Sequence, residues 1–451
     1  MSNTLTHTVL IEKLVPGGFG LGRLLEGIVV MVRYVLPGEK VLLRELHRKK
    51  QFIHGELVKV LEPSPDRITP PCPLFTQCGG CDLKHTGYDT QIRLKTAMLV
   101  ENLQRTAGTT IRQTEDIIKQ PIASPETFGY RQRIRLQVDE SGRFGFYHAD
   151  SHVLVPVAHC MLAHPKLNEV LEQLDTAVNF PELLKQSASI ELLYNPGQDD
   201  VVLLLDFKRK PRPKDRTHAR QVQESIEAVS QVVMQVSDHG VFVPQNDHCL
   251  PKPPLLSQAL PPDIVGSSLS LSWEAGGFCQ VNLQQNFNLI KLVHGLVNPD
   301  LHLRVLDLFC GLGNFSLPIA LSGAEVVGLD GQGSAIRSAR RNAELARITN
   351  CSFQKTPILN GVQQLITANQ TFHTILIDPP RQGAAEIIAL LPKLQARQII
   401  YISCNPATLA RDLALLHSSG YELCRLIPVD MFPQTHHLEC VALLEQSRLS
   451  S

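Results

Sequence analysis

The sequence predicts an α/β protein in which a Rossmann-like domain follows a small N-terminal β-barrel and a central antiparallel β domain. The chain has 451 residues, which is too long for one ordinary hydrophobic core and favours two or three domains. From about residue 304, short aliphatic runs alternate with helical segments, as in a parallel sheet with crossover helices. Before that point, short strand-like runs are separated by glycine and proline turns, which is typical of antiparallel β structure.

The composition excludes several classes of protein. Hydrophobic residues make up 43% of the chain and charged residues 19%, as in a globular protein and not a disordered one. No apolar run approaches the roughly eighteen residues of a spanning helix, and the N-terminus lacks the pattern of a signal peptide. We therefore expect a cytoplasmic protein with no membrane partner. The 11 cysteines are an odd number in a long chain, which favours metal or catalytic roles over a disulfide framework.

The N-terminal barrel is predicted at residues 1–62. Its five pieces are 8–14, the glycine-rich stretch 17–22, 27–34, 40–46 and 55–61. Residues 1–60 contain nine Lys or Arg but only five Glu and no Asp, a local excess of positive charge that suits an anionic ligand. Four prolines between residues 63 and 71 then mark a linker.

The remaining chain divides between the central and Rossmann-like domains. A helical pattern covers residues 88–106, and alternating runs predict central strands at 133–138, 190–194, 201–207 and 269–273. The runs of the Rossmann-like sheet are 305–309, 325–329, 373–377, 398–403, 421–429 and 438–443. We therefore place the central domain at 63–90 and 126–270, and the Rossmann-like domain at 91–125 and 271–451.

A cofactor crevice is predicted after the first strand of this sheet. The stretch "VLDLFCGLGNF" at 305–315 is an apolar strand followed by a glycine turn and a helix that starts near Asn314. Ligands of such sheets bind beyond the carboxyl ends of the strands. The third glycine of the dinucleotide fingerprint is missing, which disfavours a pyrophosphate. Asp330 ends the next strand, where a carboxylate accepts hydrogen bonds from ribose hydroxyls. A ribose without a pyrophosphate fits S-adenosylmethionine and predicts a methyltransferase.

Two further strand ends supply chemistry. Asp378 in "ILIDPPRQG" precedes two prolines that direct the chain across the crevice. The segment resembles the Asn/Asp-Pro-Pro-aromatic signature of amino-group methyltransferases, but Arg381 replaces the aromatic residue. Cys404 in "YISCNPATL" follows the next strand. The Asp-Pro-Pro segment keeps methylation of an exocyclic amino group as the alternative reaction, but that reaction has no use for the thiol of Cys404.

A thiol at this position fits methylation of uracil at C5. Adding a thiolate to C6 makes C5 electron-rich enough to accept a methyl group. The site should then lower the pKa of Cys404 or deprotonate the thiol on attack. A base must afterwards remove the C5 proton, and Glu439 in "HHLECVALL" is the candidate, with His436 or His437 as alternatives.

Together, "DLFCGLGNF", "DPPRQGA", "SCNPATLARD" and "HLE" closely resemble the bacterial RNA (uracil-5-)-methyltransferase family, especially its 23S ribosomal RNA members. The resemblance implies that Cys404 is the nucleophile and Glu439 the base. It implies that Phe278 in "GGFCQVN" lies beside the target base. The cofactor contacts that it implies are Gln280, Phe309, Asn314, Asp330 and Asp378. The family often carries an asparagine near the adenine, and this chain departs from that pattern with Pro357, which leaves that cofactor contact open.

Four cysteines precede the catalytic residues. Cys72, Cys78 and Cys81 lie in "CPLFTQCGGC", and Cys160 lies in "VAHCMLAHP". Four thiolates hold either a tetrahedral zinc ion or an iron–sulfur cluster, and the chemistry leaves both open. The spacing matches that of family members with a 4Fe-4S cluster, so the resemblance favours the cluster.

RNA is the expected partner. The barrel resembles a TRAM domain, whose phosphate contacts here would be Arg44, Arg48, Lys49 and Lys50. Arg131 and Arg133 in "YRQRIRL" match a basic motif of the family and are expected to contact the substrate. A second basic run, "KRKPRPKDR" at 208–216, fits an RNA contact or a solvated loop equally well.

We expect 23S ribosomal RNA as the substrate, with transfer RNA as the alternative, and a monomer as the family's usual form. The alternative from another class is an RNA-binding protein with an inactive methyltransferase domain. The target uridine must leave its stack before a thiol can reach C6, so single-stranded loops are the expected sites.

Overall fold

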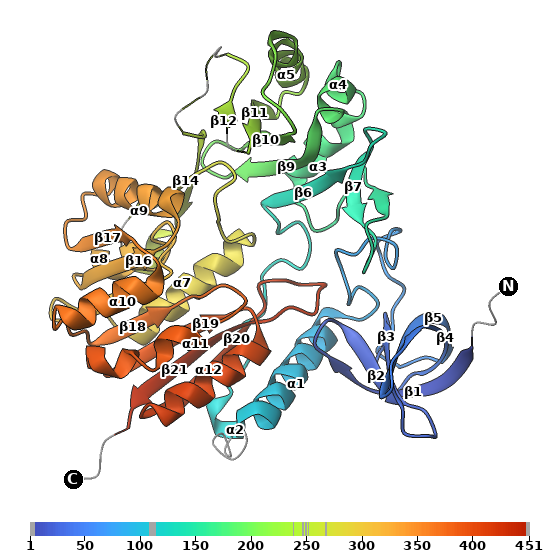
Figure 1. The fold of residues 1–451 in the computed structure, drawn as a ribbon, viewed down its shortest axis with the longest axis horizontal. Coiled ribbons are helices and arrows are strands. Elements are labelled where there is room, and N and C mark those ends of the chain that lie inside the picture. Colours follow the sequence, from blue (N-terminus) through green and yellow to red (C-terminus); the bar gives the residue numbers. More distant parts are fainter. Residues whose placement is uncertain are drawn as a thin grey trace.

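The computed structural model describes residues 5–107, 114–237, 239–245, 248, 250, 252–266 and 268–447. They form three lobes, which are a closed barrel, a central sheet and a larger sheet with helices on both faces (Figure 1). This architecture confirms the predicted fold class. No helix among these residues is both long enough and apolar enough to cross a membrane.

The barrel closes in the order β1-β2-β3-β5-β4, with strands β1 Thr6–Val15, β2 Phe19–Arg23, β3 Val29–Arg33, β4 Lys40–Arg48 and β5 Phe52–Glu62. The glycine-rich stretch forms a strand, β2, and not only a turn. A Cβ atom on Gly20 would lie 2.3 Å from Cγ2 of Val35, and one on Gly22 would lie 2.4 Å from the carbonyl oxygen of Leu10. Glycine is therefore needed where the barrel wall packs closely on itself.

The central sheet has the order β12-β11-β10-β9-β6-β7-β8. Its strands are β6 Arg133–Val138, β7 Phe144–Tyr147, β8 Leu154–Pro156, β9 Ser187–Asn195, β10 Asp200–Phe207, β11 Val229–Val236 and β12 Gly240–Phe242. Neighbouring strands are antiparallel except β10 and β11, which are parallel and are joined across helix α5 Pro213–Ser225. The basic run expected in a loop therefore ends inside α5.

Helices α3 Pro165–Leu174 and α4 Phe180–Leu184 pack with α5 on one face of this sheet. Val201, Leu203 and Leu205 of β10 belong to that core. Val202 and Leu204 point the other way, into a core shared with the hairpin of β13 Leu255–Leu260 and β14 Leu269–Glu274. Burial on both faces explains why β10 is continuously apolar.

The hairpin joins the central sheet to the larger lobe. Leu256 and Trp273 share one core with Leu289 of helix α7 Leu283–Val297. The expected domain boundary at residue 270 therefore falls inside β14. A short helix, α6 Pro262–Val265, connects the two hairpin strands.

The larger sheet has the order β17-β16-β15-β18-β19-β21-β20, and β21 runs antiparallel to both of its neighbours. The strands are β15 Arg304–Leu308, β16 Glu325–Asp330, β17 Cys351–Lys355, β18 Thr374–Ile377, β19 Gln398–Ser403, β20 Tyr421–Val429 and β21 Glu439–Gln446. The sequence analysis did not predict β17, because this edge strand is short and only Phe353 of its five residues is buried.

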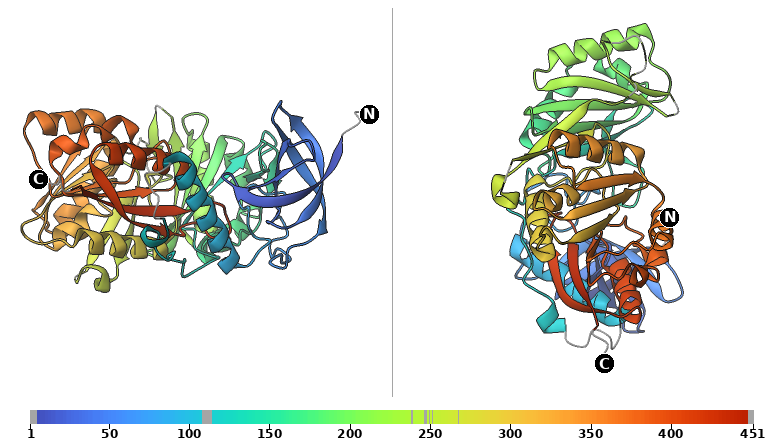
Figure 2. Two further views of the ribbon diagram at one scale, coloured as in Figure 1. Left: turned by 90° about the horizontal axis from the view of Figure 1, so that it is seen from below. Right: turned by 90° about the vertical axis from the view of Figure 1, so that its left-hand side faces the viewer.

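Helices cover both faces of the larger sheet and give two cores (Figure 2). Ile400 and Ile402 of β19 enter one core, whereas Ile399 and Tyr401 enter the other. The remaining helices are α8 Ser316–Leu321, α9 Gly333–Leu345, α10 Ile358–Thr367, α11 Ala385–Ile388, the 3-10 helix η2 Leu391–Leu394 and α12 Pro406–Ser418.

A segment from the first third of the chain completes this lobe. Helix α1 Tyr88–Ala107 packs beside α12 (Figure 1), and α2 Thr114–Ile117 follows it. Ile118 and Ile122 then pair with Leu426 and Val429 of β20. The ammonium of Lys95 lies 2.8 Å from the carboxylate of Asp430, with both side chains fully buried. These contacts fasten α1 to the segment that leads into β21.

Candidate active site

One cavity of about 600 Å³ lies at the carboxyl ends of the parallel strands. Eight residues that the sequence analysis assigned to the cofactor, the target base or catalysis all line it: Phe278, Gln280, Phe309, Asn314, Asp330, Asp378, Cys404 and Glu439. They come from loops after β14, β15, β16, β18 and β19 and from the start of β21. The fold therefore brings together residues that lie more than 150 positions apart in the sequence.

The local sequence around Cys404 explains why its thiol faces the cavity. Strand β19 ends at Ser403, and α12 begins at Pro406. Asn405 caps the helix, because its Oδ1 accepts a hydrogen bond from the amide of Ala407 at 3.1 Å. Proline at the first helical position needs no hydrogen bond through its nitrogen. Cys404 is thus fixed in the sharp turn between strand and helix.

The register of β19 and β21 brings Glu439 to the same place. Ser403 pairs with Cys440 across the antiparallel ladder. Continuing that register by one position sets Cys404 opposite Glu439. A thiol and a carboxylate therefore lie close together in the cavity.

The two groups titrate in a buried, negatively charged environment. Burial raises the pKa of Cys404 to about 11, and the charges of Glu439 and Asp378 add to the effect, whereas Arg381 opposes it. Burial, followed by the charge of Asp378, also raises the pKa of Glu439 well above its usual range. The expectation of a lowered thiol pKa is wrong for the chain without ligands. Deprotonation of the thiol on attack is the alternative that fits.

The cofactor end of the cavity is built from backbone in unusual conformations. Phe309, Gly311 and Gly313 have φ angles of 64°, 56° and 89°. The carboxylate of Asp330 accepts hydrogen bonds from the amides of Gly311 at 3.0 Å and Gln332 at 2.7 Å. Asp330 therefore holds the turn after β15 against the end of β16, and its side chain also lines the cavity.

Asn314 is held by a residue that the sequence analysis missed. The side-chain amides of Asn314 and Asn286 donate to each other's oxygen atoms at 2.9 and 3.0 Å. Asn286 also lines the cavity. Asn286 is one of three buried polar residues, with Asn282 and Gln285, at the start of helix α7, and their burial is visible only in the structure.

The loop after Asp378 is tied to the turn that contains Cys404. Oδ2 of Asp412 accepts hydrogen bonds from the amide of Ala384 at 2.7 Å and the hydroxyl of Tyr401 at 2.6 Å. The side chain of Asn405 donates to the carbonyl of Arg381 at 3.1 Å. The pKa of Asp378 is raised to about 7 by burial and by the charge of Asp307.

Phe278 stands at the mouth of the cavity and is 65% exposed. Arg133 donates to the carbonyl of Gly277 at 2.9 Å and pairs with Glu191 at 2.7 Å. The amide of Gln132 donates to the carbonyl of Val281 at 3.0 Å. The central sheet therefore supports the loop that presents Phe278, and the guanidinium of Arg133 is occupied in that support.

Pro357 lies at the start of α10 and has no side-chain amide. The neighbouring Ile358 lines the cavity instead. At this departure from the family's pattern, the cavity wall is therefore apolar.

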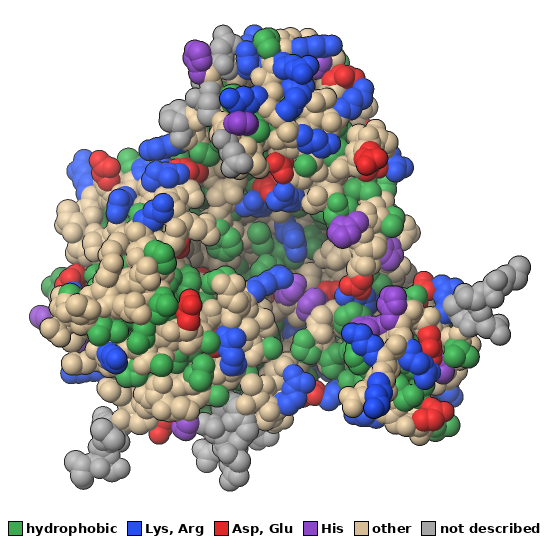
Figure 3. Space-filling view, in the orientation of Figure 1, with side chains coloured by type: hydrophobic (Ala, Val, Ile, Leu, Met, Phe, Trp, Pro, Cys, Tyr) green, Lys and Arg blue, Asp and Glu red, His purple; other side chains and the backbone are tan. Residues whose placement is uncertain are grey.

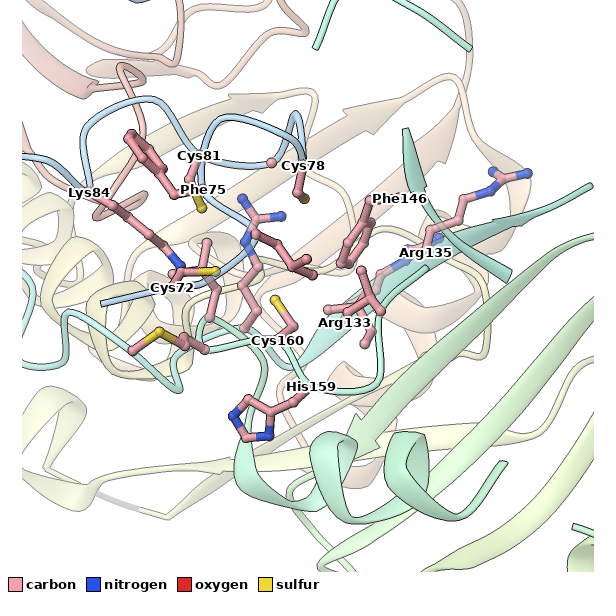
Figure 4. A pocket seen from close by; sticks show the side chains of 17 residues that line it. Cys72, Phe75, Cys78, Cys81, Lys84, Arg133, Arg135, Phe146, His159 and Cys160 are labelled. Carbon is pink, nitrogen blue, oxygen red and sulfur yellow. The ribbon is translucent and has the colours of Figure 1, made fainter. Parts of the chain in front are cut away.

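The four cysteines assigned to a metal line a second cavity of about 270 Å³ (Figure 4). Cys72, Cys78 and Cys81 come from the loop before α1, and Cys160 approaches from the central domain. Among the described residues, no three His, Cys, Asp or Glu side chains already surround a single-ion site.

The surroundings of this second cavity suit a larger, negatively charged group. Lys84 and Arg131 contribute to its wall. The Nε atom of Arg131 is buried and has no hydrogen-bond partner. A group with acceptor atoms would satisfy it, because buried donors are normally paired. Arg131, expected to contact RNA, thus lies beside the four thiols.

The face shown in Figure 3 is hollowed where the three lobes meet, and Lys and Arg side chains gather within and above the hollow. Such a basic concave surface attracts a polyanion even though the net charge of the chain is zero.

Comparisons with known proteins show similarity to RNA uracil-5 methyltransferases. The family model described as tRNA (uracil-5-)-methyltransferase matches residues 122–447. A curated 23S rRNA (uracil(1939)-C(5))-methyltransferase from Vibrio parahaemolyticus is 32% identical over 99% of this chain and 97% of its own length. A protein of the same description from Pseudomonas entomophila is 34% identical over 97% of this chain and 93% of its own length.

A solved structure shows the same fold. The crystal structure of the Pyrococcus abyssi tRNA (uracil-54, C5)-methyltransferase in complex with S-adenosyl-L-homocysteine matches with a TM-score of 0.72. The match covers 97% of this chain and 100% of that chain at 24% sequence identity.

Proposed function

Because the chain belongs to the tRNA (uracil-5-)-methyltransferase family, we propose that it methylates C5 of a uridine in 23S ribosomal RNA with S-adenosylmethionine as the donor. The observation that supports this proposal is that Cys404, Glu439 and Asp330 line one cavity, with the ladder pair Ser403 and Cys440 directly beside the first two.

The cavity fits S-adenosylmethionine by its chemistry. Asp330 would accept the ribose hydroxyls, and the carboxylate of Asp378 suits a ligand with positive charges. Gln280, Phe309 and Asn314 would complete the contacts. The donor, when bound, supplies an electrophilic methyl group on a sulfonium.

The residues of this chain act on the uracil in a definite order. Phe278 contacts the extruded base at the mouth of the cavity. The thiol of Cys404 gives its proton to water, its sulfur forms a bond to C6, and the electrons of the C5–C6 double bond become available at C5. After C5 carries the new methyl group, Glu439 takes the remaining C5 proton. The electrons of that C–H bond restore the double bond, and the C6–S bond breaks with its electron pair returning to the sulfur of Cys404.

We also propose that the second cavity binds a 4Fe-4S cluster. Cys72, Cys78, Cys81 and Cys160 would be its ligands, and Lys84 and Arg131 would balance its charge. Removing a methyl group from a sulfonium is not a redox step, so the cluster would be structural. It would join the loop before α1 to the central domain.

Ribosomal RNA is favoured over transfer RNA as the substrate. Relatives named for 23S rRNA are 32% to 34% identical over nearly the whole chain. The structure named for tRNA is 24% identical. We propose that Arg133 contributes to RNA binding by supporting the loop that carries Phe278. We also propose that the RNA strand with the target uridine binds in the hollow shown in Figure 3.

The protein is proposed to act as a cytoplasmic monomer. One chain carries every residue named above in the cavity, so no second copy is needed to complete it. The division into a barrel, a cluster domain and a catalytic domain is likewise proposed to separate RNA binding from methyl transfer.

The experiment that tests the proposal uses 5-fluorouridine. Replacing the C5 hydrogen by fluorine prevents its removal, so the RNA should stay bonded to the protein when the donor is added. We expect a 23S rRNA transcript with 5-fluorouridine to give an adduct that survives denaturing electrophoresis. Cys404→Ala should give none.

A tritium assay separates the alternatives. C5 methylation of [5-³H]uridine RNA releases tritium, whereas methylation of an exocyclic amino group retains it. An inactive RNA-binding protein would show neither release nor methyl incorporation. Transfer RNA labelled in the same way shows whether it is a better substrate than 23S rRNA.

A further inference from the structure

The segment between β20 and β21 delivers Glu439 to the cavity. It begins after Val429 and carries His436 and His437 just before β21. His437 lines the cavity together with Cys404 and Glu439. The rings of His436 and His437 lie 4.1 Å apart between centroids, so the position of one restrains the other.

The loop that carries Cys72, Cys78 and Cys81 forms several hydrogen bonds with this segment. Nδ1 of His436 donates to Oδ2 of Asp82 at 2.6 Å, and the backbone amide of His436 donates to the same oxygen at 3.3 Å. The amides of Asp82 and Leu83 both donate to the carbonyl of Gln434 at 3.0 Å. Asp82 follows Cys81 directly, so the contact spans 354 positions of sequence.

The barrel holds Asp82 from the other side. Nη1 of Arg33, at the end of β3, donates to Oδ1 of Asp82 at 3.2 Å and to the carbonyl of Gly17 at 2.7 Å. Nε and Nη2 of the same guanidinium donate to both oxygens of Asp150 at 2.7 and 3.0 Å. The guanidinium also lies 4.0 Å from the ring centroid of Phe19.

The contacts at Asp82 are the sheltered part of this arrangement, because the side chains of Arg33 and Asp82 are only 20% and 13% exposed. Asp150 is 64% exposed, and its forked hydrogen bonds fix the orientation of the Arg33 guanidinium toward Asp82. Asp150, Arg33, Asp82 and His436 belong to the central domain, the barrel, the cysteine loop and the catalytic domain, respectively.

We propose that Asp150, Arg33, Asp82 and His436 form a positioning network that holds Glu439 for proton removal from C5. None of the four lines the cavity, so they act through the segment that leads into β21. The inference rests on the proposed function, because it assigns a support to the base of that reaction. It makes the last chemical step depend on how the barrel and the cysteine loop are docked.

A displaced base has a specific consequence. Glu439 acts only after the methyl group is on C5, so earlier steps continue without it. The methylated RNA then stays bonded to Cys404. A misplacement of about 1 Å costs about a hundredfold in rate at a catalytic centre. Accumulated adduct on ordinary uridine RNA is therefore a signature that general loosening of the fold does not produce.

The test uses the full-length chain as Asp82→Ala and His436→Ala variants. Each is mixed with a 23S rRNA transcript and methyl-labelled S-adenosylmethionine, and samples are run on a denaturing gel. We expect release of methylated RNA to slow about tenfold to a hundredfold, with labelled adduct in its place. Glu439→Gln on the same gel provides the reference, and His436→Asn, which keeps an N–H donor toward Asp82, should restore release.

A matched control separates base positioning from attachment of the barrel. Lys13 of β1 forms an ion pair with Glu101 of α1, which is a second contact between the barrel and the catalytic domain. Lys13→Gln removes that contact without changing Asp82 or His436 and should release RNA as the wild type does. If Lys13→Gln accumulates the same adduct, the specific role of the network is overturned.

The remaining outcomes are also decisive. If Asp82→Ala and His436→Ala release RNA at the wild-type rate, or form neither adduct nor product, the network does not position the base. If these variants show no adduct while Glu439→Gln does, only this inference fails. If Glu439→Gln shows no adduct, the assignment of the base fails and the inference fails with it.

Discussion

At the residue scale, the site is defined by the surroundings of Cys404 and Glu439. A thiol in a strand-to-helix turn and a carboxylate at a strand end are ordinary features by themselves. Here the ladder register makes them neighbours, and burial raises the pKa values of both. Burial disfavours the charged form of both groups, because an unpaired buried charge is costly.

The charge of Asp378 gives a testable pH dependence. Burial and Asp378 raise the pKa of Glu439, whereas Arg381 lowers it. Only the ionised carboxylate accepts the proton, so RNA release should rise with pH through the pKa of Glu439. Asp378→Asn should shift that rise to lower pH, and Arg381→Gln should shift it to higher pH. Release from preformed adduct, followed as a function of pH with saturating donor, measures both shifts, and equal shifts in one direction would contradict the assignment.

The pair of Asn286 and Asn314 gives a second prediction. Asn286→Ala leaves the amide of Asn314 without its partner, and an unmatched buried polar group costs about 1–3 kcal/mol. We expect the KM for S-adenosylmethionine to rise about tenfold, while the 5-fluorouridine adduct still forms at saturating donor. Asn288→Ala is the control, because Asn288 donates only to Gln285 and lies outside the cavity. An unchanged KM in Asn286→Ala would exclude this role.

At the scale of elements, the strand ends and helix starts position the chemistry. Each parallel strand of the larger sheet finishes at the same edge, so the loops that follow converge. Capping by Asn405 and the carboxylate of Asp412 then hold two of those loops together. Helix α1 supports the opposite side, since Lys95 and Gln91 hold the segment after β20.

The buried pair of Lys95 and Asp430 predicts a large loss of stability when one partner is removed. Lys95→Met leaves the carboxylate of Asp430 buried without its cation, which costs about 3–5 kcal/mol. Replacing both residues, as Lys95→Met with Asp430→Leu, should recover much of that loss because no lone charge remains. Denaturant unfolding of the wild type, Lys95→Met, Asp430→Leu and the double variant measures the free energy of unfolding. An equally unstable double variant would contradict this account.

At the scale of the whole molecule, the cysteine loop lies where the three lobes meet. It contributes thiols to the second cavity and a hydrogen bond from Asp82 to the segment before Glu439. The barrel, the second cavity and the large cavity are therefore connected by direct contacts. A change in one lobe has a direct route of contacts to the others.

Iron and sulfide analysis of protein purified without oxygen tests the proposed cluster. We expect about four irons and four sulfides per chain, whereas a zinc site would hold one zinc ion. Cys160→Ser removes the ligand supplied by the central domain and should lower the iron content strongly. Cys424→Ser is the control, since Cys424 lies outside the second cavity. Full iron content in Cys160→Ser would remove it from the ligand set.

Much of the catalytic lobe was predictable because its signals are local. The apolar runs before Asp330, Asp378 and Cys404 mark strands, and polar residues directly after them mark the functional edge. The family and the fold class predicted in this way are confirmed. Strand β17, the central strands β7, β8, β11 and β12, the hairpin strand β13 and the parallel pairing of β10 with β11 were not predicted. Several of these strands are only three to six residues long and leave weak patterns, and pairing direction is not encoded locally.

The sequence by itself determined which chemical groups end each strand, and hence the reaction class, because strand ends and turns are encoded by neighbouring residues. Only the tertiary structure decided how these groups behave. The raised pKa of Cys404, the support of Asn314 by Asn286 and the contact of Asp82 with His436 depend on segments far apart in the chain. Burial, register and docking set such contacts, and no local pattern of residues contains them.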